Sequence, residues 1–324
     1  MADVKFGLFV PQGWKMDLDQ IDDPVEQFEA MTAVGKLADT RTQFDSIWVY
    51  DHLHTVPTPE IETTFECWTI SATLARDTER VKIGQMVGCN GYRNPALYAK
   101  IASTVDVASH GRLFAGIGAG WYEQEWRAYG YEWNDTPIRM AKFREAAEII
   151  HKMWRDEKTS FQGKHYTIDG AINEPKGAGH QPPKFWIGGG GEQVTLKLVA
   201  RFADACNVGG GVADTIAHKL EILKRHCDTV GRDYDSIVKS TSCDPVVIVD
   251  KESDIPGALA KVKGYAATSA FMQSPWVATT DMMIERLQAC KAAGADYFIV
   301  KMPNAAYNHE EVLRFNEEVI PALS

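Results

Sequence analysis

The segment WVYDHLHTV, residues 48–56, carries an aspartate and two histidines within four positions, directly after a run of large apolar side chains. His52 can donate or accept a proton near neutral pH. Asp51 can instead accept backbone N–H groups and hold a loop. A metal site would need a further ligand, which neither an HExxH motif nor a Cys/His spacing supplies nearby. The segment therefore favours a proton-transfer role for His52 or a loop-stabilising role for Asp51, with His54 on the rim and no metal.

A glycine-rich turn, WIGGGGEQ at residues 186–193, is the second candidate. The four glycines Gly188, Gly189, Gly190 and Gly191 leave a predicted strand and enter a predicted helix. Their backbone N–H groups, beside the positive end of that helix, can hold a phosphate. A turn with only a structural role needs one or two glycines, so we predict phosphate binding. The segment GIGAGW, residues 116–121, lacks the spacing of a dinucleotide fingerprint and is typical of close backbone approach at a barrel rim.

The aromatic residues, and the absence of two catalytic motifs, limit the reactions that the protein could catalyse. Most of the tryptophans are expected in the core, but Trp121 and Trp276 are expected to reach a cleft and line a substrate pocket. The sequence contains neither a GxSxG elbow nor a Walker loop, so nucleophilic acyl transfer and nucleotide hydrolysis have no support.

The elements that must position these residues alternate regularly. Short apolar runs are each followed by a segment with apolar residues at helical spacing, about eight times along the chain. The predicted strands fall at residues 4–11, 45–52, 80–87, 111–120, 184–190, 204–210, 236–249 and 296–303. Strands separated by helices of this length lie parallel with right-handed crossovers. A (β/α)8 TIM barrel is therefore the first interpretation, and a doubly wound open sheet is the alternative.

In either fold the reactive groups lie at the carboxyl ends of the strands. Asp51 and His52 follow the second predicted strand, whereas Asn90, Tyr92 and Arg93 follow the third. Trp121, Glu123 and Glu125 follow the fourth. We expect one domain over residues 1–324, with insertions at the rim at about 158–183 and 250–278.

Composition sets the broad class. The 324 residues are 45% hydrophobic and 24% charged, as in a globular protein with a large core. A formal net charge of −10 argues against a nucleic-acid binder. Without a basic and apolar leader at its start or a run of about 20 apolar residues, the chain is expected in the cytoplasm and away from membranes. The six cysteines have no CxxC spacing and are expected to be free core residues.

The chain as a whole resembles the bacterial luciferase-like superfamily, and within it the oxidoreductases that use the 8-hydroxy-5-deazaflavin coenzyme F420. The resemblance covers nearly the whole sequence and rests on YDHLH (residues 50–54), on GCNGYRNPALYAKIASTVDVASHGRLFAGIGAGWYEQEWRAYG (88–130), on RMAKFREAAEIIHKMW (139–154), on QPPKFWIGGGGEQVTLKLVARFADACN (181–207) and on EEVIPAL (317–323). It implies a barrel with insertions, usually a homodimer, with the deazaflavin or flavin ring over the strand ends.

The resemblance also implies roles for individual residues. Asp51 and His52 match the family's Asp-His pair, in which the histidine transfers the proton. Asn90 matches a cofactor-binding loop, and Gly188 to Gly191 with Glu192 and Gln193 match the turn that holds the cofactor phosphate. Arg139 matches a helix segment near the cofactor tail. The family often has a non-proline cis peptide beneath the ring, here at Met86–Val87 or Val87–Gly88.

The sequence departs from the sugar-phosphate dehydrogenases of this superfamily at two places. Trp121 stands where those enzymes have a glutamate after GxGxG, and NVGGGVAD, residues 207–214, lacks their lysine. A larger, flatter or less charged substrate is implied. We therefore expect hydride transfer between C5 of F420 and an organic substrate, such as an electron-poor nitroaromatic of the nitrophenol type. The alternatives are a monooxygenase that uses flavin mononucleotide (FMN) and a non-catalytic cofactor carrier.

Overall fold

The computed structural model describes residues 4–262 and 276–323. Eight parallel strands form a closed barrel, because the open ends of the sheet pair through β3 and β5. The strands are β1 (Lys5–Phe9), β2 (Ser46–Val49), β3 (Lys82–Gln85), β5 (Leu113–Gly118), β8 (Lys184–Gly188), β9 (Ala205–Asn207), β10 (Val238–Cys243) and β13 (Tyr297–Val300), with the short β4 (Gly88–Cys89) extending the pairing of β5. The closure confirms the barrel and removes the open-sheet alternative.

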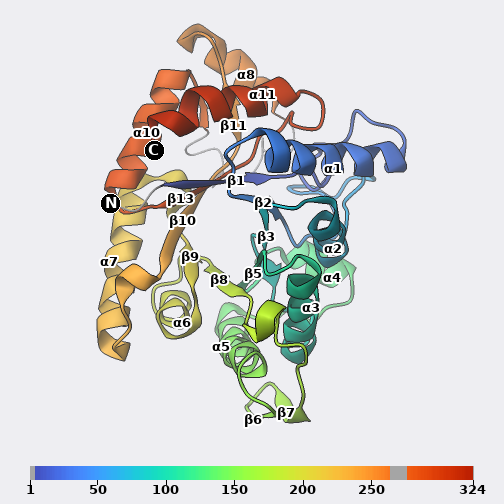
Figure 1. The fold of residues 1–324 in the computed structure, drawn as a ribbon, viewed down its shortest axis with the longest axis vertical. Helices are drawn as coiled ribbons and strands as arrows, with labels where there is room; N and C mark the ends of the chain where they lie inside the picture. The colour runs from blue at the N-terminus through green and yellow to red at the C-terminus, as the bar shows by residue number, and fades with distance from the viewer. Residues whose placement is uncertain (1–3, 263–275, 324) are drawn as a thin grey trace.

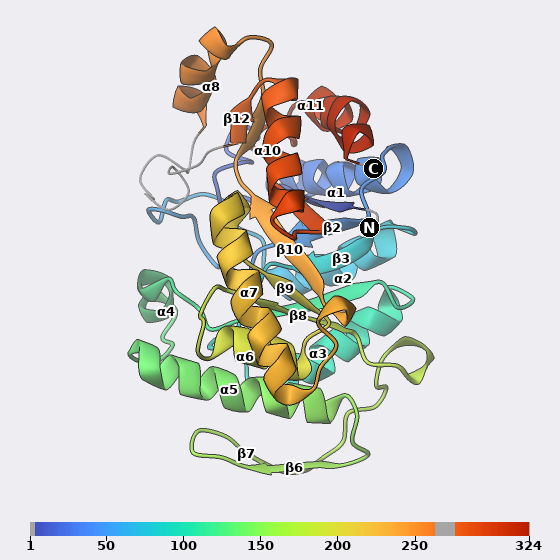
Figure 2. The same ribbon diagram turned by 90° about the vertical axis from the view of Figure 1, so that its left-hand side faces the viewer.

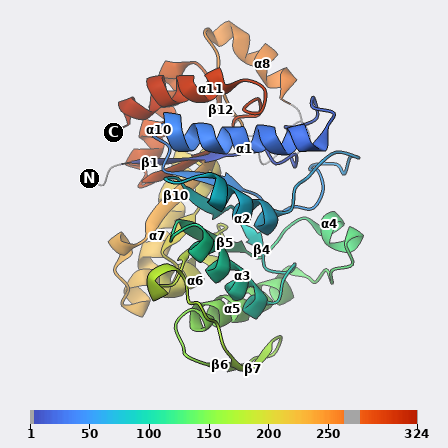
Figure 3. The ribbon, with the colours of Figure 1, turned by 45° about the vertical axis from the view of Figure 1, so that its right-hand side comes forward.

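Helices connect successive strands and surround the barrel (Figure 1). Figure 3 shows α1, α2 and α3 one above another along one side, with α4 standing away from the strands. The helices are α1 (Pro24–Arg41), α2 (Cys67–Asp77), α3 (Pro95–Ala108), α4 (Glu123–Ala128), α5 (Thr136–Met153), α6 (Thr195–Phe202), α7 (Ala213–Val230), α8 (Ile255–Lys261), α10 (Thr280–Ala292) and α11 (His309–Arg314). Shorter helical turns are η1 (Ala178–His180), η2 (Gly209–Gly211), η3 (Tyr234–Ser236), η4 (Glu252–Asp254), η5 (Phe315–Val319) and η6 (Ile320–Ala322).

Several of these helices begin with the same local device. Asp23, Asn94 and Asp135 are the N-cap residues of α1, α3 and α5, and each side chain accepts a hydrogen bond from a backbone N–H in the first turn. A proline follows within the first two helical positions in all three cases, where its missing N–H costs nothing. These starts fix the points at which the chain leaves the strand ends and turns back along the barrel.

Two further small sheets interrupt the barrel order. An antiparallel hairpin of β6 (Thr159–Gln162) and β7 (Thr167–Ala171) lies beyond α5, at the bottom of Figure 2. The run at residues 236–249, expected as one strand, is two: β10 stays in the barrel, whereas β11 (Val246–Ile248) pairs with β12 (Trp276–Ala278). Of the second expected insertion, residues 263–275 lie outside the described residues. The single domain and the insertion boundaries stay predictions.

The interior of the barrel is filled by aromatic side chains. Trp48 is fully buried, and its ring occupies space that side chains on the neighbouring strands would need. A Cβ atom at Gly7 would lie 2.3 Å from Trp48 Nε1, and one at Gly84 would lie 2.3 Å from Trp48 Cε3. The glycines thus let one large ring close the barrel below the reactive end. All six cysteines are buried and free, as expected.

Candidate active site

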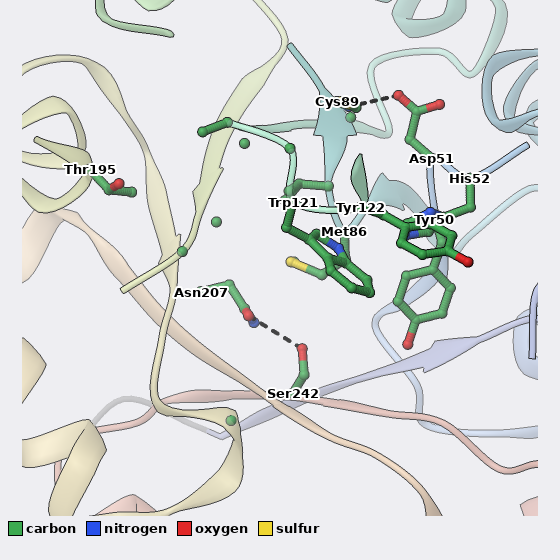
Figure 4. Close-up of a pocket in the computed structure, with 18 of the residues that line it drawn as sticks. Tyr50, Asp51, His52, Met86, Cys89, Trp121, Tyr122, Thr195, Asn207 and Ser242 are labelled. Carbon is green, nitrogen blue, oxygen red and sulfur yellow. Dashed lines mark hydrogen bonds between the residues drawn. The ribbon is translucent and has the colours of Figure 1, made fainter. Parts of the chain in front are cut away.

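A cavity of about 630 Å³ lies at the carboxyl ends of the barrel strands. Figure 4 shows His52, Tyr50, Trp121, Tyr122 and Met86 on one side of it, and Asn207, Ser242 and Thr195 on the other. These residues follow different strands, so the barrel alone brings them together. The residues that line the cavity include Trp14, Tyr50, Asp51, His52, Met86, Val87, Trp121, Tyr122, Gly188, Gly189, Thr195, Asn207, Ser242 and Asp244.

His52 is held to Glu125, a carboxylate that sequence reasoning placed at a strand end without a role. The distance from His52 Nδ1 to Glu125 Oε2 is 2.9 Å. The other carboxylate oxygen, Oε1, accepts hydrogen bonds from the backbone N–H groups of Leu53 at 2.6 Å and His54 at 3.2 Å. The Tyr92 hydroxyl also donates to Glu125 Oε2. Glu125 therefore fixes both the ring of His52 and the loop that carries it.

The charge of Glu125 follows from these partners. The side chain is fully buried, and burial alone would raise its pKa. The hydrogen bonds from His52, Tyr92 and Leu53 together with the charge of His52 outweigh burial and lower the pKa of Glu125 below its ordinary value. An ionised Glu125 can only accept a hydrogen bond, so Nδ1–H of His52 donates to it and Nε2 is left to exchange a proton with a bound molecule.

Aromatic rings enclose His52. The Trp14 ring stacks on the imidazole with centroids 4.4 Å apart and an interplanar angle of 3°. Trp121 meets the imidazole edge-on at 5.8 Å. The imidazole is thus held in one orientation, with only 8% of the His52 surface exposed. His54 packs against Tyr122 and does not line the cavity.

Asp51 points away from His52 and binds groups from the next loops. Its Oδ2 accepts a hydrogen bond from the backbone N–H of Cys89 at 2.7 Å and one from Arg93 Nη1 at 2.6 Å. Arg93 Nη2 reaches Asp51 Oδ1 at 3.1 Å and Glu66 Oε1 at 2.6 Å. These contacts are those of the loop-stabilising role weighed from the sequence, and they tie the ends of β2 and β4 together.

The floor of the cavity is formed by backbone and one valine. The Met86–Val87 peptide bond is cis, which answers the choice that the sequence left open. The Val87 side chain fills space beside glycines of β5 and β8: a Cβ atom would lie 2.6 Å from Val87 at Gly118 and 2.7 Å from it at Gly188. A flat ring can approach this floor because neither strand carries a side chain there.

The start of the glycine-rich turn lines the same cavity. Gly188, Gly189 and Thr195 line the cavity, whereas Gly190, Gly191, Glu192 and Gln193 do not. A Cβ atom at Gly190 would meet Lys219 at 3.4 Å, its nearest neighbour, so the backbone of the turn is open to a ligand. The Glu192 side chain is bound to Lys219 at 2.6 Å and to His218 at 3.0 Å, and therefore anchors the turn to α7.

Asn90 and Arg139 line a smaller adjoining cavity of about 230 Å³, which shares Ala119 and Trp126 with the first. Arg139 stacks on Trp133, with the guanidinium carbon 3.9 Å from the ring centroid. Neither residue lines the main cavity.

Of the two tryptophans expected at the cleft, one lies there and the other does not. Trp121 lines the cavity and is 52% exposed. Trp276 does not reach it: the side chain is fully buried, and the Arg286 guanidinium lies 4.2 Å from its ring centroid. The expectation for Trp276 was wrong because β12 leaves the barrel and packs this ring into the core beside Gly211.

A buried charged cluster beside the cavity had no sequence signal beyond isolated charges. The Tyr50 hydroxyl donates to Asp244 Oδ2 at 3.1 Å, and both residues line the cavity. Burial lowers the pKa of Lys15 to about 8, although the charge of Asp244 opposes this. Lys301 pairs with Asp17 next to it. No group of three or more metal-ligating side chains occurs within residues 4–262 and 276–323.

Comparisons with known proteins agree with the fold. A model of the luciferase-like monooxygenase family matches residues 4–296. The chain is 28% identical over 310 residues to a phthiodiolone/phenolphthiodiolone dimycocerosates ketoreductase of Mycobacterium kansasii, covering 89% of this chain and 80% of that protein. It is 29% identical over 222 residues to an F420-dependent glucose-6-phosphate dehydrogenase of Segniliparus rotundus, covering 66% of this chain and 64% of that protein.

Solved structures share the whole architecture. An F420-dependent secondary alcohol dehydrogenase in complex with an F420-acetone adduct superposes with a TM-score of 0.79 at 20% identity, covering 100% of both chains. The monooxygenase RslO1 from Streptomyces bottropensis gives a TM-score of 0.78 at 16% identity, covering 99% of this chain and 100% of that one. At these identities the likeness shows a common fold alone. No helix in the described part of the chain is long and apolar enough to cross a membrane.

Proposed function

The chain belongs to the luciferase-like monooxygenase family, and we propose that it is a coenzyme F420-dependent oxidoreductase that transfers a hydride between the deazaflavin and an organic substrate. The observation that carries the proposal is the His52–Glu125 pair at the edge of a flat-floored cavity. The names of relatives that use F420, among them the dehydrogenase of Segniliparus rotundus, support the choice of coenzyme.

The residues at the cavity fit a flat, phosphate-bearing cofactor. Val87 fills the space in front of Gly118 and Gly188, so neither glycine adds a side chain to the floor. Gly190 offers a backbone N–H group before α6, whereas the N–H of Gly189 donates to the backbone carbonyl of Asn207 at 3.1 Å. Asn90 and Arg139 would hold the polar tail from the adjoining cavity. When bound there, the deazaflavin supplies or accepts the hydride.

The protein's own groups then handle the proton. Addition of a hydride to a substrate leaves a negative charge, and removal of a hydride from an alcohol leaves a proton to be taken. His52 Nε2 can serve either direction, because Glu125 holds Nδ1 and compensates the charge of the imidazolium. Trp14, Trp121 and Tyr122 exclude water from this ring.

For the substrate we propose a flat, electron-poor aromatic molecule such as a nitrophenol. The cavity wall supports this class, since Trp14, Tyr50, Trp121 and Tyr122 present aromatic surface to it. Trp121 also occupies the position after GxGxG, so we propose that glucose 6-phosphate is not a substrate. We further propose that the protein is a cytoplasmic homodimer. Light scattering of the purified protein would test the oligomeric state.

The test is reconstitution of the purified protein with F420 or with FMN, each with and without oxygen. Hydride transfer from reduced F420 to a nitrophenol without oxygen supports the proposal. Oxygen consumption with FMN would assign the protein to the monooxygenases, and tight binding of either cofactor without turnover of any substrate would make it a carrier.

A further inference from the structure

One side of the active-site cavity is polar and takes no part in the proton transfer described above. Asn207, at the end of β9, and Ser242, in β10, lie across the cavity from His52 (Figure 4), and Asp244, just beyond β10, lines the cavity with them. We call Asn207, Ser242 and Asp244 the polar wall. A substrate whose reacting atom is near His52 would meet the polar wall with its other end.

The polar wall is held in a fixed position relative to His52. The Tyr50 hydroxyl donates a hydrogen bond to Asp244 Oδ2 at 3.1 Å. The Trp14 ring contacts both sides of this arrangement, because its centroid lies 4.0 Å from that of Tyr50 and 4.4 Å from that of His52. One tryptophan therefore sets the place of the proton-transfer group and, through Tyr50, the place of the carboxylate.

Asp244 belongs to a buried cluster of four charges. The charged neighbours of Lys15 are Asp244, Lys301 and Asp17, and Lys301 pairs with Asp17. Each of the four residues is at most 8% exposed. Among the described residues that line the cavity, Asp244 is the one member of this cluster. The cluster is neutral as a whole, but the cavity meets its carboxylate and neither lysine.

The hydroxyl protons beside Asp244 are already used within the protein. The proton of Tyr50 goes to Asp244 itself, and the Ser242 hydroxyl donates to Asn207 Oδ1 at 3.3 Å. Burial, together with the charge of Asp244, raises the pKa of Tyr50 well above its ordinary value, so the tyrosine keeps its proton. A carboxylate accepts several hydrogen bonds and donates none. At Asp244 the cavity therefore offers a bound molecule a negatively charged acceptor.

Asp51, the other aspartate that lines the cavity, does not offer the same chemistry. Arg93 binds both of its oxygens, at 2.6 Å and 3.1 Å, and the backbone N–H of Cys89 donates to one of them. The guanidinium thus neutralises Asp51 at the cavity edge. Asp244 differs because Lys15 and Lys301 stand outside the lining.

We propose that Asp244 is a specificity-determining residue, which accepts a hydrogen bond from a hydroxyl group of the substrate and so selects a neutral phenol over its phenolate. This inference rests on the proposed function and names the form in which a nitrophenol binds. A hydrogen bond to a charged acceptor is among the strong ones, whereas two like charges in a buried site repel each other. The same carboxylate thus favours a donor and disfavours an anion of similar size.

The test compares dissociation constants, measured by calorimetry with oxidised F420 bound, for three flat ligands of similar size. Para-nitrophenol can donate a hydrogen bond, and para-nitrotoluene has a methyl group in place of the hydroxyl. Para-nitrobenzoate is an anion at a pH at which the nitrophenol is neutral, and all titrations are made at that pH. Oxidised coenzyme has no hydride to give, so binding is measured without turnover.

The proteins are the wild type, Asp244→Asn and the double variant Lys15→Met/Asp244→Asn. The double variant leaves the cluster neutral, with the pair of Lys301 and Asp17 intact, and decides the test if the single variant does not fold. Asp250→Asn removes a carboxylate that pairs with Arg314 at the surface, and is the matched control.

We expect the wild type to bind para-nitrophenol about 10- to 100-fold more tightly than para-nitrotoluene, the range for a hydrogen bond to a charged acceptor. Asp244→Asn should lower this preference about fivefold or more, because an amide oxygen is a weaker acceptor. The same variant should bind para-nitrobenzoate about 10-fold more tightly than the wild type does, since the like charge is gone. Asp250→Asn should match the wild type with all three ligands.

The opposite signs of these two effects separate recognition from a structural role, which would weaken all three ligands together. Such a uniform loss overturns the inference. Equal binding of para-nitrophenol and para-nitrotoluene by the wild type, or an unchanged preference in a folded variant, also overturns it and leaves the proposed function standing. Failure of the folded wild type to bind F420 overturns the proposed function, and the inference with it.

Discussion

The Nδ1 atom of His52 lies 2.9 Å from Oε2 of Glu125, although 73 residues separate the two in the sequence. The carboxylate is fully buried and accepts two further hydrogen bonds from the backbone of residues 53 and 54. The pair therefore joins the loop after β2 to α4. Its geometry directs Nε2 of His52 away from Glu125.

Replacement of Glu125 by glutamine should lower turnover by about 10- to 1,000-fold with little change in cofactor affinity, because an amide cannot compensate the charge of a protonated His52. When the protein reduces its substrate, activity should be lost as the pH rises, and in this variant the loss should begin at a lower pH than in the wild type. The pH profile of kcat and a fluorescence titration of the cofactor measure both effects. Glu123→Gln is the matched control, since its half-exposed side chain binds Arg127 and no other charged group in the described part of the chain. A normal pH profile in Glu125→Gln would contradict the role.

His52→Ala should lose about 10²- to 10⁴-fold in turnover when proton transfer limits the rate, and should bind the cofactor almost normally. His54→Ala should keep its turnover within about threefold, because His54 lies outside the cavity lining and offers no proton to it. Steady-state kinetics with and without a chelator compare the two variants. An inactive His54 variant, or activity abolished by the chelator and restored by zinc, would show that the histidines serve another purpose.

Gly190→Val should weaken cofactor binding about 10-fold or more, because the branched side chain would cover the backbone N–H groups of the turn. The folded protein should tolerate the change, since the nearest atom to a new Cβ is the flexible Lys219 side chain at 3.4 Å. Gly257→Val, at a surface position where no atom of residues 4–262 and 276–323 lies within 4 Å of a Cβ, is the control. Calorimetric titration gives the affinities, and equal values for variant and wild type would remove the turn from the cofactor site.

Asp51→Asn should destabilise the fold by about 2–4 kcal/mol, because the largely buried Arg93 would lose its bidentate carboxylate and keep only the half-exposed Glu66 as a partner. The urea midpoint of unfolding measures the loss. Turnover per folded molecule should change little, since the Asp51 carboxyl faces Arg93 and Cys89. A variant with normal stability and no turnover would instead show that Asp51 has a direct catalytic role.

The stability of the protein should increase between pH 8 and 10 through Lys15. Its pKa falls from 10.5 to about 8 on folding, so below pH 8 the folded state carries a buried charge that the unfolded state holds in water. That penalty disappears as the pH rises from the folded towards the unfolded pKa. The wild type should therefore gain roughly 1–3 kcal/mol relative to Lys15→Met between pH 7 and 10. Urea unfolding at several pH values checks this, and parallel curves would contradict it.

The sequence was sufficient for the barrel because each strand is a short apolar run and each helix has its own start signal, such as Asp23 before Pro24. The rule that reactive groups lie at the strand ends also placed His52, Trp121 and the glycine-rich turn at the cavity, where Gly188 and Gly189 line it. These features are local, so a linear pattern contains them.

Contacts between distant segments could not be read in this way. Glu125 was noted at a strand end, but nothing in the sequence says that its carboxylate meets His52 across the barrel rim. Trp276 was misplaced because the chain leaves the barrel after β10 and pairs β12 with β11. An aromatic cluster in the sequence looks the same whether it faces a cleft or the core. The contact of Glu125 with His52 and the position of Trp276 both depend on tertiary packing.

The packing of Val87, which lies between β3 and β4, ties together positions on β5 and β8. Its methyl groups occupy the space in front of Gly118 and Gly188, so no side chain can be added at either glycine while the valine remains. Mutational effects at these positions are therefore expected to be non-additive. Protein engineers who wish to reshape the floor for a bulkier cofactor or a different ring angle would need paired libraries, in which Val87 becomes smaller as a glycine becomes larger. Single-site scanning would score each of these positions as intolerant and miss the combinations that fold.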